Sequence, residues 1–355
     1  MPFLDPLHKV MNRGDLSVAE AQAAMREVFN GDASTAQLAA FLAALRVKGE
    51  TAEEIEGFAR AMREGCLRIE HGILDEPVID TCGTGGDALG TINVSTAAAF
   101  VVAAAGVRVA KHGNRSFTST SGSADVLEAL GVRIDLTPER VAESIRTVGI
   151  GFLFAPALHP AMKHAIAARL ELKTRTVFNL LGPLANPANA SVQIVGAPST
   201  HIAQLIAEAL ANLGLLYGFV VHGEDGLDEV SVTSTTVAYE VSGGSVTKRL
   251  FSPEDFGVSR STLMDLRGED PAHNAARIRA ILSGERGPQR DIVVANAALA
   301  IYAAQRAAQA VGQNPGGRAD IGDDLLGAAR IAANSIDSGA AATKLEEFIA
   351  FTVRE

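Results

Sequence analysis

The pattern of apolar positions changes near residue 72. Before that point apolar residues recur at spacings of three and four, which is typical of amphipathic helices. Ser17, Ser34 and Thr51 each stand three residues before a Glu or Gln, and this capping-box pattern marks the start of a helix. The pattern predicts a small all-helical N-terminal domain over residues 1–72. We expect helices around residues 160–185 to pack into the same domain.

From residue 78 onward, short apolar runs alternate with helical segments. This alternation predicts a larger α/β domain over residues 73–355 with a mainly parallel central sheet. Binding loops of such a sheet gather at the carboxyl ends of its strands. Strands are expected at residues 78–80, 107–110, 151–154, 192–195 and 219–221, and helices between them include residues 124–130 and 137–148.

The last third of the chain has a different pattern. Residues 235–250 alternate as a β-hairpin does, with Gly243 and Gly244 at the turn. Two or three helices should follow between Pro271 and Phe351, and residues 312–324 form the best candidate for a mobile loop.

Two of the predicted N-terminal helices carry broad apolar faces. Ordinary core explains such faces, and we prefer this interpretation to the alternative of a subunit interface. One face is formed by Leu38, Phe41, Leu42 and Leu45, and the other by Ile55, Phe58 and Met62.

Composition narrows the class of protein. The chain has 355 residues, 47% hydrophobic and 20% charged, which describes a soluble globular protein with room for two domains. Its net charge of -10 argues against general nucleic-acid binding, which depends on neutralising phosphates. No apolar run reaches membrane-spanning length without charge, and only Cys66 and Cys82 are available as thiols. We expect a cytoplasmic protein, with Cys82 as a small packing residue rather than a nucleophile.

Two loops could bind an anion. Gly83, Gly85 and Gly86 lack side chains, so the backbone can turn sharply and bring N–H donors close to a phosphate. Ser95 and Thr96 begin an alanine-rich helix, whose N-terminus attracts negative charge. The spacing matches neither the P-loop nor the dinucleotide-binding motif. A simple helix cap is the alternative for the loop Asn93-Val94-Ser95-Thr96.

A third loop is rich in hydroxyl groups and follows a short predicted strand. Lys111 and Arg115 would add positive charge there, and the dense hydroxyls could wrap a phosphate or a polyol. The alternative is a polar surface turn. We favour a binding role because the cluster directly follows an apolar strand. The hydroxyl residues are Ser116, Thr118, Ser119, Ser121 and Ser123.

Two further segments carry charge that could serve a reaction. Asp228 and Glu229 follow an apolar strand and could hold Mg²⁺, with a solvated acidic turn as the alternative. Arg169 could form a bidentate pair with a substrate carboxylate, and we expect it on the same helix as His159. The histidines could be structural, and we assign them no proton-transfer role.

These motifs, in this order, closely resemble the anthranilate phosphoribosyltransferases of tryptophan biosynthesis. The resemblance spans nearly the whole chain, including SPEDFG and IDSGAAATKLEEFIAFT near the C-terminus. The matching motifs are GTGGD at 83–87, NVST at 93–96, KHGNR at 111–115, SGSADVLEALG at 121–131, FLFAPALHPAMK at 152–163, RTVFNLLGPLANPA at 175–188 and VVHGEDGLDE at 220–229.

The resemblance implies a fold, an assembly and a reaction. The fold would be that of type III phosphoribosyltransferases, which pyrimidine nucleoside phosphorylases share. The protein would be a homodimer formed through the helical domain. It would transfer phosphoribosyl from 5-phosphoribosyl 1-diphosphate to the amine of anthranilate, and it would use Mg²⁺, with two ions per subunit.

The resemblance also assigns residues to each ligand. The phosphoribosyl donor would be bound by Gly83, Gly86, Asp87, Thr91, Asn93, Val94, Ser95, Thr96, Lys111, His112, Gly113, Asn114, Arg115, Ser116, Phe117, Thr118, Ser119 and Ser123. Anthranilate would be bound by Gly83, Asn114 and Arg169, and Mg²⁺ by Ser95, Asp228 and Glu229.

The chain departs from the family pattern at three places. Lys173 stands where the family usually has glycine, residues 166–168 replace a typical proline-valine run, and the loop at 312–324 is longer than usual. The first two departures affect the direction of the helix that carries Arg169.

Two other functions fit the same fold. A nucleic-acid-binding paralogue should lack the acceptor arginine or the metal pair and carry a basic surface, whereas this chain retains both and is acidic. A pyrimidine nucleoside phosphorylase needs no magnesium-diphosphate site, and Asp228-Glu229 together with KHGNR disfavour it.

Overall fold

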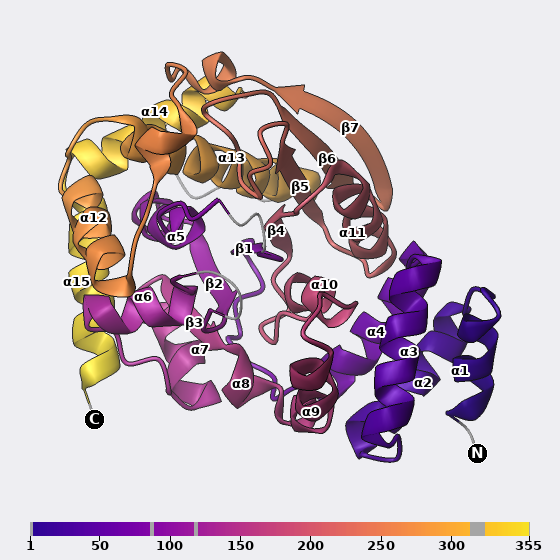
Figure 1. The fold of residues 1–355 in the computed structure, drawn as a ribbon. Helices are drawn as coiled ribbons and strands as arrows, with labels where there is room; N and C mark the ends of the chain where they lie inside the picture. The colour runs from indigo at the N-terminus through magenta and orange to yellow at the C-terminus, as the bar shows by residue number, and fades with distance from the viewer. Residues whose placement is uncertain (1–2, 86–88, 117–119, 313–323, 355) are drawn as a thin grey trace.

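The computed structural model describes residues 3–85, 89–116, 120–312 and 324–354, and it combines a helical region with an α/β region (Figure 1). The prediction of an all-helical N-terminus is confirmed, and Ser17, Ser34 and Thr51 each form the expected capping box. The four helices are α1 (Leu4–Met11), α2 (Val18–Asn30), α3 (Thr35–Lys48) and α4 (Ala52–Glu64).

The central sheet has seven strands in the order β3-β2-β1-β4-β5-β6-β7. The first five strands are parallel, and β6 and β7 form the expected antiparallel hairpin. Gly243 and Gly244 both have positive φ at its turn, a conformation that glycine adopts without strain. The strands are β1 (Val78–Gly83), β2 (Arg108–Gly113), β3 (Ile150–Phe154), β4 (Val192–Gly196), β5 (Tyr217–Gly223), β6 (Thr236–Ser242) and β7 (Ser245–Phe251).

Strand order places a binding crevice between β1 and β4. From β1 the chain adds β2 and β3 on one side, whereas β4 and β5 are added on the other. Connections leave the carboxyl ends of β1 and β4 in opposite directions, so a crevice opens above them. The sheet therefore directs the predicted binding loops to this edge.

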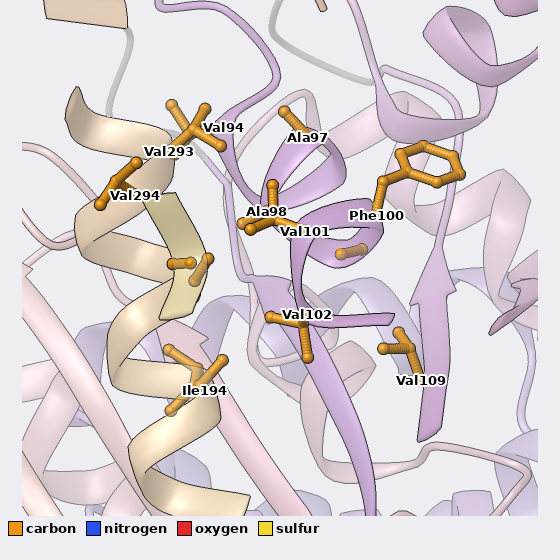
Figure 2. Packing of buried hydrophobic residues seen from close by; sticks show 14 of the residues in the cluster. Val94, Ala97, Ala98, Phe100, Val101, Val102, Val109, Ile194, Val293 and Val294 are labelled. Atoms are coloured by element: carbon orange, nitrogen blue, oxygen red, sulfur yellow. The ribbon is translucent and has the colours of Figure 1, made fainter. Parts of the chain in front are cut away.

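Helices cover both faces of the sheet. Helices α5 (Val94–Ala104) and α13 (Pro288–Ala310) pack together on one face, and Figure 2 shows their small and β-branched side chains beside those of β2 and β4. The opposite face carries α7 (Pro138–Thr147), α10 (Phe178–Leu184) and α11 (Thr200–Asn212). The remaining helices are α6 (Ser123–Leu130), α8 (Ala155–Leu158), α9 (Lys163–Leu172), α12 (Pro271–Leu282), α14 (Leu325–Asp337) and α15 (Ala340–Val353).

The expectation of two or three C-terminal helices was wrong, because the described residues from Pro271 onward form four. Gly284 and Gly287 have positive φ and, with Pro288, separate α12 from α13. Gly339, also at positive φ, separates α14 from α15. The proposed loop at 312–324 lies largely outside the described residues. No helix in the described ranges is long and apolar enough to cross a membrane.

The two predicted apolar faces are core, as we preferred. Leu38, Phe41, Ile55 and Phe58 are each at most 1% exposed within a single chain. Helices α9 and α10 contribute to the same core, and the rings of Phe29 and Phe178 lie 6.4 Å apart. The helical region is thus completed by a later part of the chain, although the domain boundary at residues 72–73 stays a prediction.

Candidate active site

The glycine-rich turn begins directly above the ends of β1 and β4. The Thr84 backbone N–H donates to the Gly196 carbonyl over 2.9 Å, and Gly85 follows with φ near 65°. Such a turn lets backbone N–H groups approach a ligand. Gly86 and Asp87, like Phe117, Thr118 and Ser119 of the third loop, lie outside the described residues.

The second loop begins α5, but its asparagine does not act as a simple helix cap. Asn93 makes no side-chain cap hydrogen bond. Its amide instead donates to the Ser121 carbonyl over 3.0 Å and accepts from the Ser121 hydroxyl and the Asn274 amide. Asn93 thus joins the second loop to the third and to α12. Thr91 also contacts Arg267 through an isolated β-bridge.

The three predicted metal ligands lie near the end of β1 and the first turn of α5. The Ser95 backbone N–H donates to Glu229 Oε1 over 3.3 Å. A side chain at Gly83 would place its Cβ 3.3 Å from Asp228 Oδ2, so this carboxylate lies against the end of β1. A Cβ at Gly196 would lie 1.7 Å from the Asp228 carbonyl oxygen, which restricts that position to glycine. Ser95 and the adjacent pair Asp228-Glu229 therefore come together from two separate loops.

This donor set suits a hard cation that keeps other ligands. Among the described residues, no three His, Cys, Asp or Glu side chains gather as a complete metal cage. Mg²⁺ is usually held by one or two carboxylates, and water and substrate phosphate oxygens complete its octahedron. Asp228, Glu229 and the Ser95 hydroxyl fit this requirement.

Lys111 lies beneath the loops rather than on their surface. Its side chain is buried, and Nζ donates to the Thr81 carbonyl and, over 3.3 Å, to the Ser95 hydroxyl. Burial lowers the pKa of Lys111, whereas the nearby Asp80 raises it. Lys111 therefore connects β2 with β1 and α5, and any effect of its charge on a ligand comes from below the loop.

Arg115 is paired with two carboxylates of α6. Its guanidinium donates to Asp125 over 3.1 Å and to both carboxylate oxygens of Glu128. Asp125 also accepts from the backbone N–H groups of Ser116 and Gly122, each over 2.9 Å. The third loop is thus organised by Asp125, a residue that the sequence analysis did not single out.

A buried histidine pair joins the end of β2 to the segment before α9. His112 Nδ1 lies 3.0 Å from the Gly182 carbonyl, which can only accept, so Nδ1 carries the proton. A neutral His112 then accepts at Nε2 from His159 Nε2, 3.2 Å away. Burial, with a smaller effect of His112, lowers the pKa of His159 to about 3. Both rings are neutral near pH 7, and the geometry supports the structural role considered from the sequence.

Arg169 lies on α9, where its guanidinium stacks 5.5 Å from the centre of the Phe178 ring. Burial lowers its pKa, although an arginine remains charged. The expectation that His159 shares this helix was wrong. Pro160 begins a 3₁₀ turn, Pro160–Met162, which separates His159 from α9.

The departure at Lys173 has a conformational cost. Lys173 ends α9 in the left-handed conformation, with φ of 47°. Glycine adopts this conformation freely, whereas a side chain there costs about 1–2 kcal/mol. The position therefore favours the glycine that the family usually has.

Three residues that the sequence analysis missed hold the loops in place. Arg175 donates to the Gly85 carbonyl over 2.7 Å and so connects the helical side of the crevice to the glycine-rich turn. Asn274 contacts Asn93, as described above, and Asn296 of α13 contacts Val230 next to the acidic pair. A polar residue in a helix or a loop gives no sequence signal that separates such a contact from exposure to solvent.

The thiol of Cys82 does not have the environment of a nucleophile. Burial, followed by the charge of Asp80, raises its pKa well above the usual value for a cysteine. Cys82 also packs against the apolar cluster shared by α9, α10 and α11. This supports its interpretation as a packing residue.

Comparisons with known proteins agree with this architecture. Residues 75–342 match the family model described as glycosyl transferase family, a/b domain, and residues 5–66 match its helical bundle domain. The chain is 52% identical over 351 residues to the anthranilate phosphoribosyltransferase of Solibacter usitatus, covering 99% of each chain.

Solved structures show the same fold over the full length. The anthranilate phosphoribosyltransferase of Thermus thermophilus is 42% identical, with a TM-score of 0.87 and coverage of 99% of this chain and 100% of that one. The Saccharomyces cerevisiae enzyme in complex with PRPP and Mg is 28% identical, with a TM-score of 0.84 and coverage of 99% and 97%. These similarities confirm the predicted fold class, and the chain belongs to the anthranilate phosphoribosyltransferase family.

Proposed function

We propose that the protein transfers the phosphoribosyl group of 5-phosphoribosyl 1-diphosphate to the amine of anthranilate, giving N-(5-phosphoribosyl)anthranilate and diphosphate. The observation that carries this proposal is the meeting of the glycine-rich turn, the α5 N-terminus and Asp228-Glu229 at one edge of the sheet. Relatives named anthranilate phosphoribosyltransferase support this proposal, as does the solved structure of the Saccharomyces cerevisiae enzyme in complex with PRPP and Mg.

The donor would bind where several loops present backbone N–H groups. The first turn of α5 lies at the positive end of the helix dipole, which favours phosphate. Asn93 ties the third loop to this turn through Ser121, and Gly83 at the end of β1 lies against Asp228. The crevice therefore suits a ligand with several phosphate groups.

Ser95, Asp228 and Glu229 would hold Mg²⁺, and we propose two ions per subunit. Bound Mg²⁺ neutralises negative charge on a diphosphate. The chain itself supplies the orientation, because Glu229 accepts from the Ser95 N–H and Lys111 holds the Ser95 hydroxyl. A solved structure of a variant of the Saccharomyces cerevisiae enzyme with Mg bound supports the use of Mg²⁺.

Anthranilate would be oriented by Gly83, Asn114 and Arg169, with the guanidinium of Arg169 paired to its carboxylate. As the C1–O bond of the donor breaks, the electron pair leaves with the diphosphate. The amine nitrogen forms the new bond to C1 and releases one proton to solvent. An aryl amine is neutral at pH 7, so no strong general base is needed, in agreement with a buried and neutral His112.

A fluorescence assay tests this function directly. Purified protein should remove anthranilate fluorescence when 5-phosphoribosyl 1-diphosphate and MgCl₂ are present, and EDTA should stop the reaction. Diphosphate should appear in an amount equal to the anthranilate consumed. A folded protein that consumes no anthranilate under these conditions would contradict the proposal, and nucleic-acid binding and uridine phosphorolysis would then test the two alternatives.

We further propose that the protein is a cytoplasmic homodimer formed through its helical region. Helices α1 and α9 both pack against α3, and each of the three helices exposes large apolar side chains. A soluble monomer rarely leaves several such residues on neighbouring helices open to water. They are Met11, 59% exposed, Val47, 72%, Ile166, 49%, and Leu170, 53%.

Introducing charge on this surface should separate the subunits. Val47→Glu should convert a dimer into a monomer at micromolar concentration, because a carboxylate would be desolvated at the interface. Light scattering coupled to size-exclusion chromatography measures the mass. Leu74→Glu is a suitable control, because Leu74 is also apolar and exposed but lies outside the helices. A Val47→Glu protein with unchanged mass would place the interface elsewhere.

A further inference from the structure

A single buried side chain holds the backbone next to the acidic pair. Asn296 Oδ1 accepts from the Val230 N–H over 2.9 Å, and Asn296 Nδ2 donates to the Val230 carbonyl over 3.0 Å. Val230 directly follows Glu229 in the chain. One amide therefore satisfies both backbone polar groups of the residue beside Glu229.

The hydrogen bonds between Asn296 and Val230 are suited to fixing the Val230 backbone. Asn296 is 4% exposed, and its Nδ2 also donates to the Ile292 carbonyl of its own helix over 2.9 Å. Loss of the amide would leave two buried backbone groups of Val230 unsatisfied, which is costly in a protein interior. The loop would then shift to reach other partners.

Helix α13, which carries Asn296, also supports the other side of the metal site. It packs along α5, whose first turn contains Ser95. The same helix therefore fixes Glu229 through Val230 and Ser95 through α5. Their relative position determines whether one cation can contact both.

Asp225 holds the loop ahead of the acidic pair. Its carboxylate accepts from the Ser231 hydroxyl over 2.6 Å, from the Thr233 hydroxyl, and from the Leu227 N–H over 3.2 Å. Asp228 and Glu229 lie between this anchor and Asn296. Adjacent carboxylates repel each other, so a loop without both anchors should relax and separate them.

We propose that Asn296 is a positioning residue that sets the affinity of the Asp228-Glu229 pair for a divalent cation. This inference rests on the proposed function only for the identity of the cation site. In this proposal Asn296 acts through the backbone of Val230, to which its amide is bonded at both oxygen and nitrogen. Groups that orient metal ligands typically change metal affinity by 10- to 100-fold when removed.

The test measures cation binding separately from activity. Mn²⁺, which replaces Mg²⁺ as a paramagnetic probe, is titrated into the protein with diphosphate present, and free Mn²⁺ is followed by electron paramagnetic resonance. Asn296→Ala should weaken Mn²⁺ binding at least about tenfold. The Mg²⁺ concentration that half-saturates turnover should rise by a similar factor, whereas the KM for anthranilate should change little.

Gln305→Leu is the matched control. Gln305 is also a buried amide on α13, and among the described residues its Nε2 has no hydrogen-bond partner. Its replacement should leave Mn²⁺ affinity unchanged. If Asn296→Ala does not fold, Asn296→Ser serves instead, because a helical serine can still bond to the Ile292 carbonyl but cannot span both groups of Val230.

The outcomes separate this inference from the proposed function. Unchanged Mn²⁺ affinity in a destabilised but folded Asn296 variant would overturn the inference and leave Asn296 a purely structural residue. Absence of Mn²⁺ binding to the unmodified protein would overturn it as well. Asn296-dependent Mn²⁺ binding by a protein that does not consume anthranilate would support the inference and reject the proposed function.

Discussion

Replacing Asp228 and Glu229 together by alanine should reduce phosphoribosyl transfer by at least about 10²-fold, a loss typical of a main electrostatic contribution to catalysis. The residual activity should no longer depend on Mg²⁺. Glu229 Oε1 lies 3.3 Å from the Ser95 nitrogen at the α5 N-terminus, and Asp228 lies against the end of β1. They are the two carboxylates among the proposed metal ligands. Without them the departing diphosphate loses its counter-charge.

Steady-state rates at several MgCl₂ concentrations measure this effect. Glu224→Ala is the matched control, because Glu224 is an exposed acid in the same loop that we place outside the site. The control should retain Mg²⁺-dependent activity. A double variant with normal, Mg²⁺-dependent turnover would remove Asp228 and Glu229 from the metal site.

Arg169→Ala should raise the KM for anthranilate by about 30-fold or more, because truncating one partner of a desolvated charge pair costs about 2–5 kcal/mol. The KM for the donor should change little, since Arg169 lies on α9 beside Phe178 and not in the donor loops. Arg169→Lys should restore only part of the loss, because lysine cannot form the planar bidentate pair.

Varying one substrate while the other is saturating measures the KM for anthranilate and the KM for the donor separately. Lys163→Ala, an exposed residue at the start of the same helix, should behave as the unmodified protein does. Equal loss of affinity for donor and acceptor in the Arg169→Ala protein would mean that Arg169 supports the crevice as a whole rather than the acceptor.

Local sequence patterns predicted the strands well because each strand is a short apolar run bounded by polar or glycine residues. They failed where a helix break depended on one or two residues. Pro160 separates His159 from Arg169, and Gly284 with Gly287 divides the segment from Pro271 to Ala310 into two helices. These residues are common in the chain, and only packing decides which of them ends a helix.

The site was predictable as a set of loops but not as a set of contacts. The pairing of β1 with β4, more than one hundred residues later in the chain, and of β4 with β5 brings Gly83 to Asp228. No local pattern specifies these pairings. The same limit hid Asn274 and Asn296, whose partners lie far away in sequence. It also hid the burial of Lys111, which resembles an exposed loop lysine in the sequence.

The shared core of the helical region has a consequence for the order in which the protein can assemble on the ribosome. Leu181 of α10 and Ala168 of α9 are buried with side chains of α2, α3 and α4. The first 72 residues therefore leave the ribosome with an apolar surface that stays open until residues 163–184 are made. A transplanted or separately expressed helical region will need both segments, and a nascent chain stalled between them is a natural substrate for chaperones.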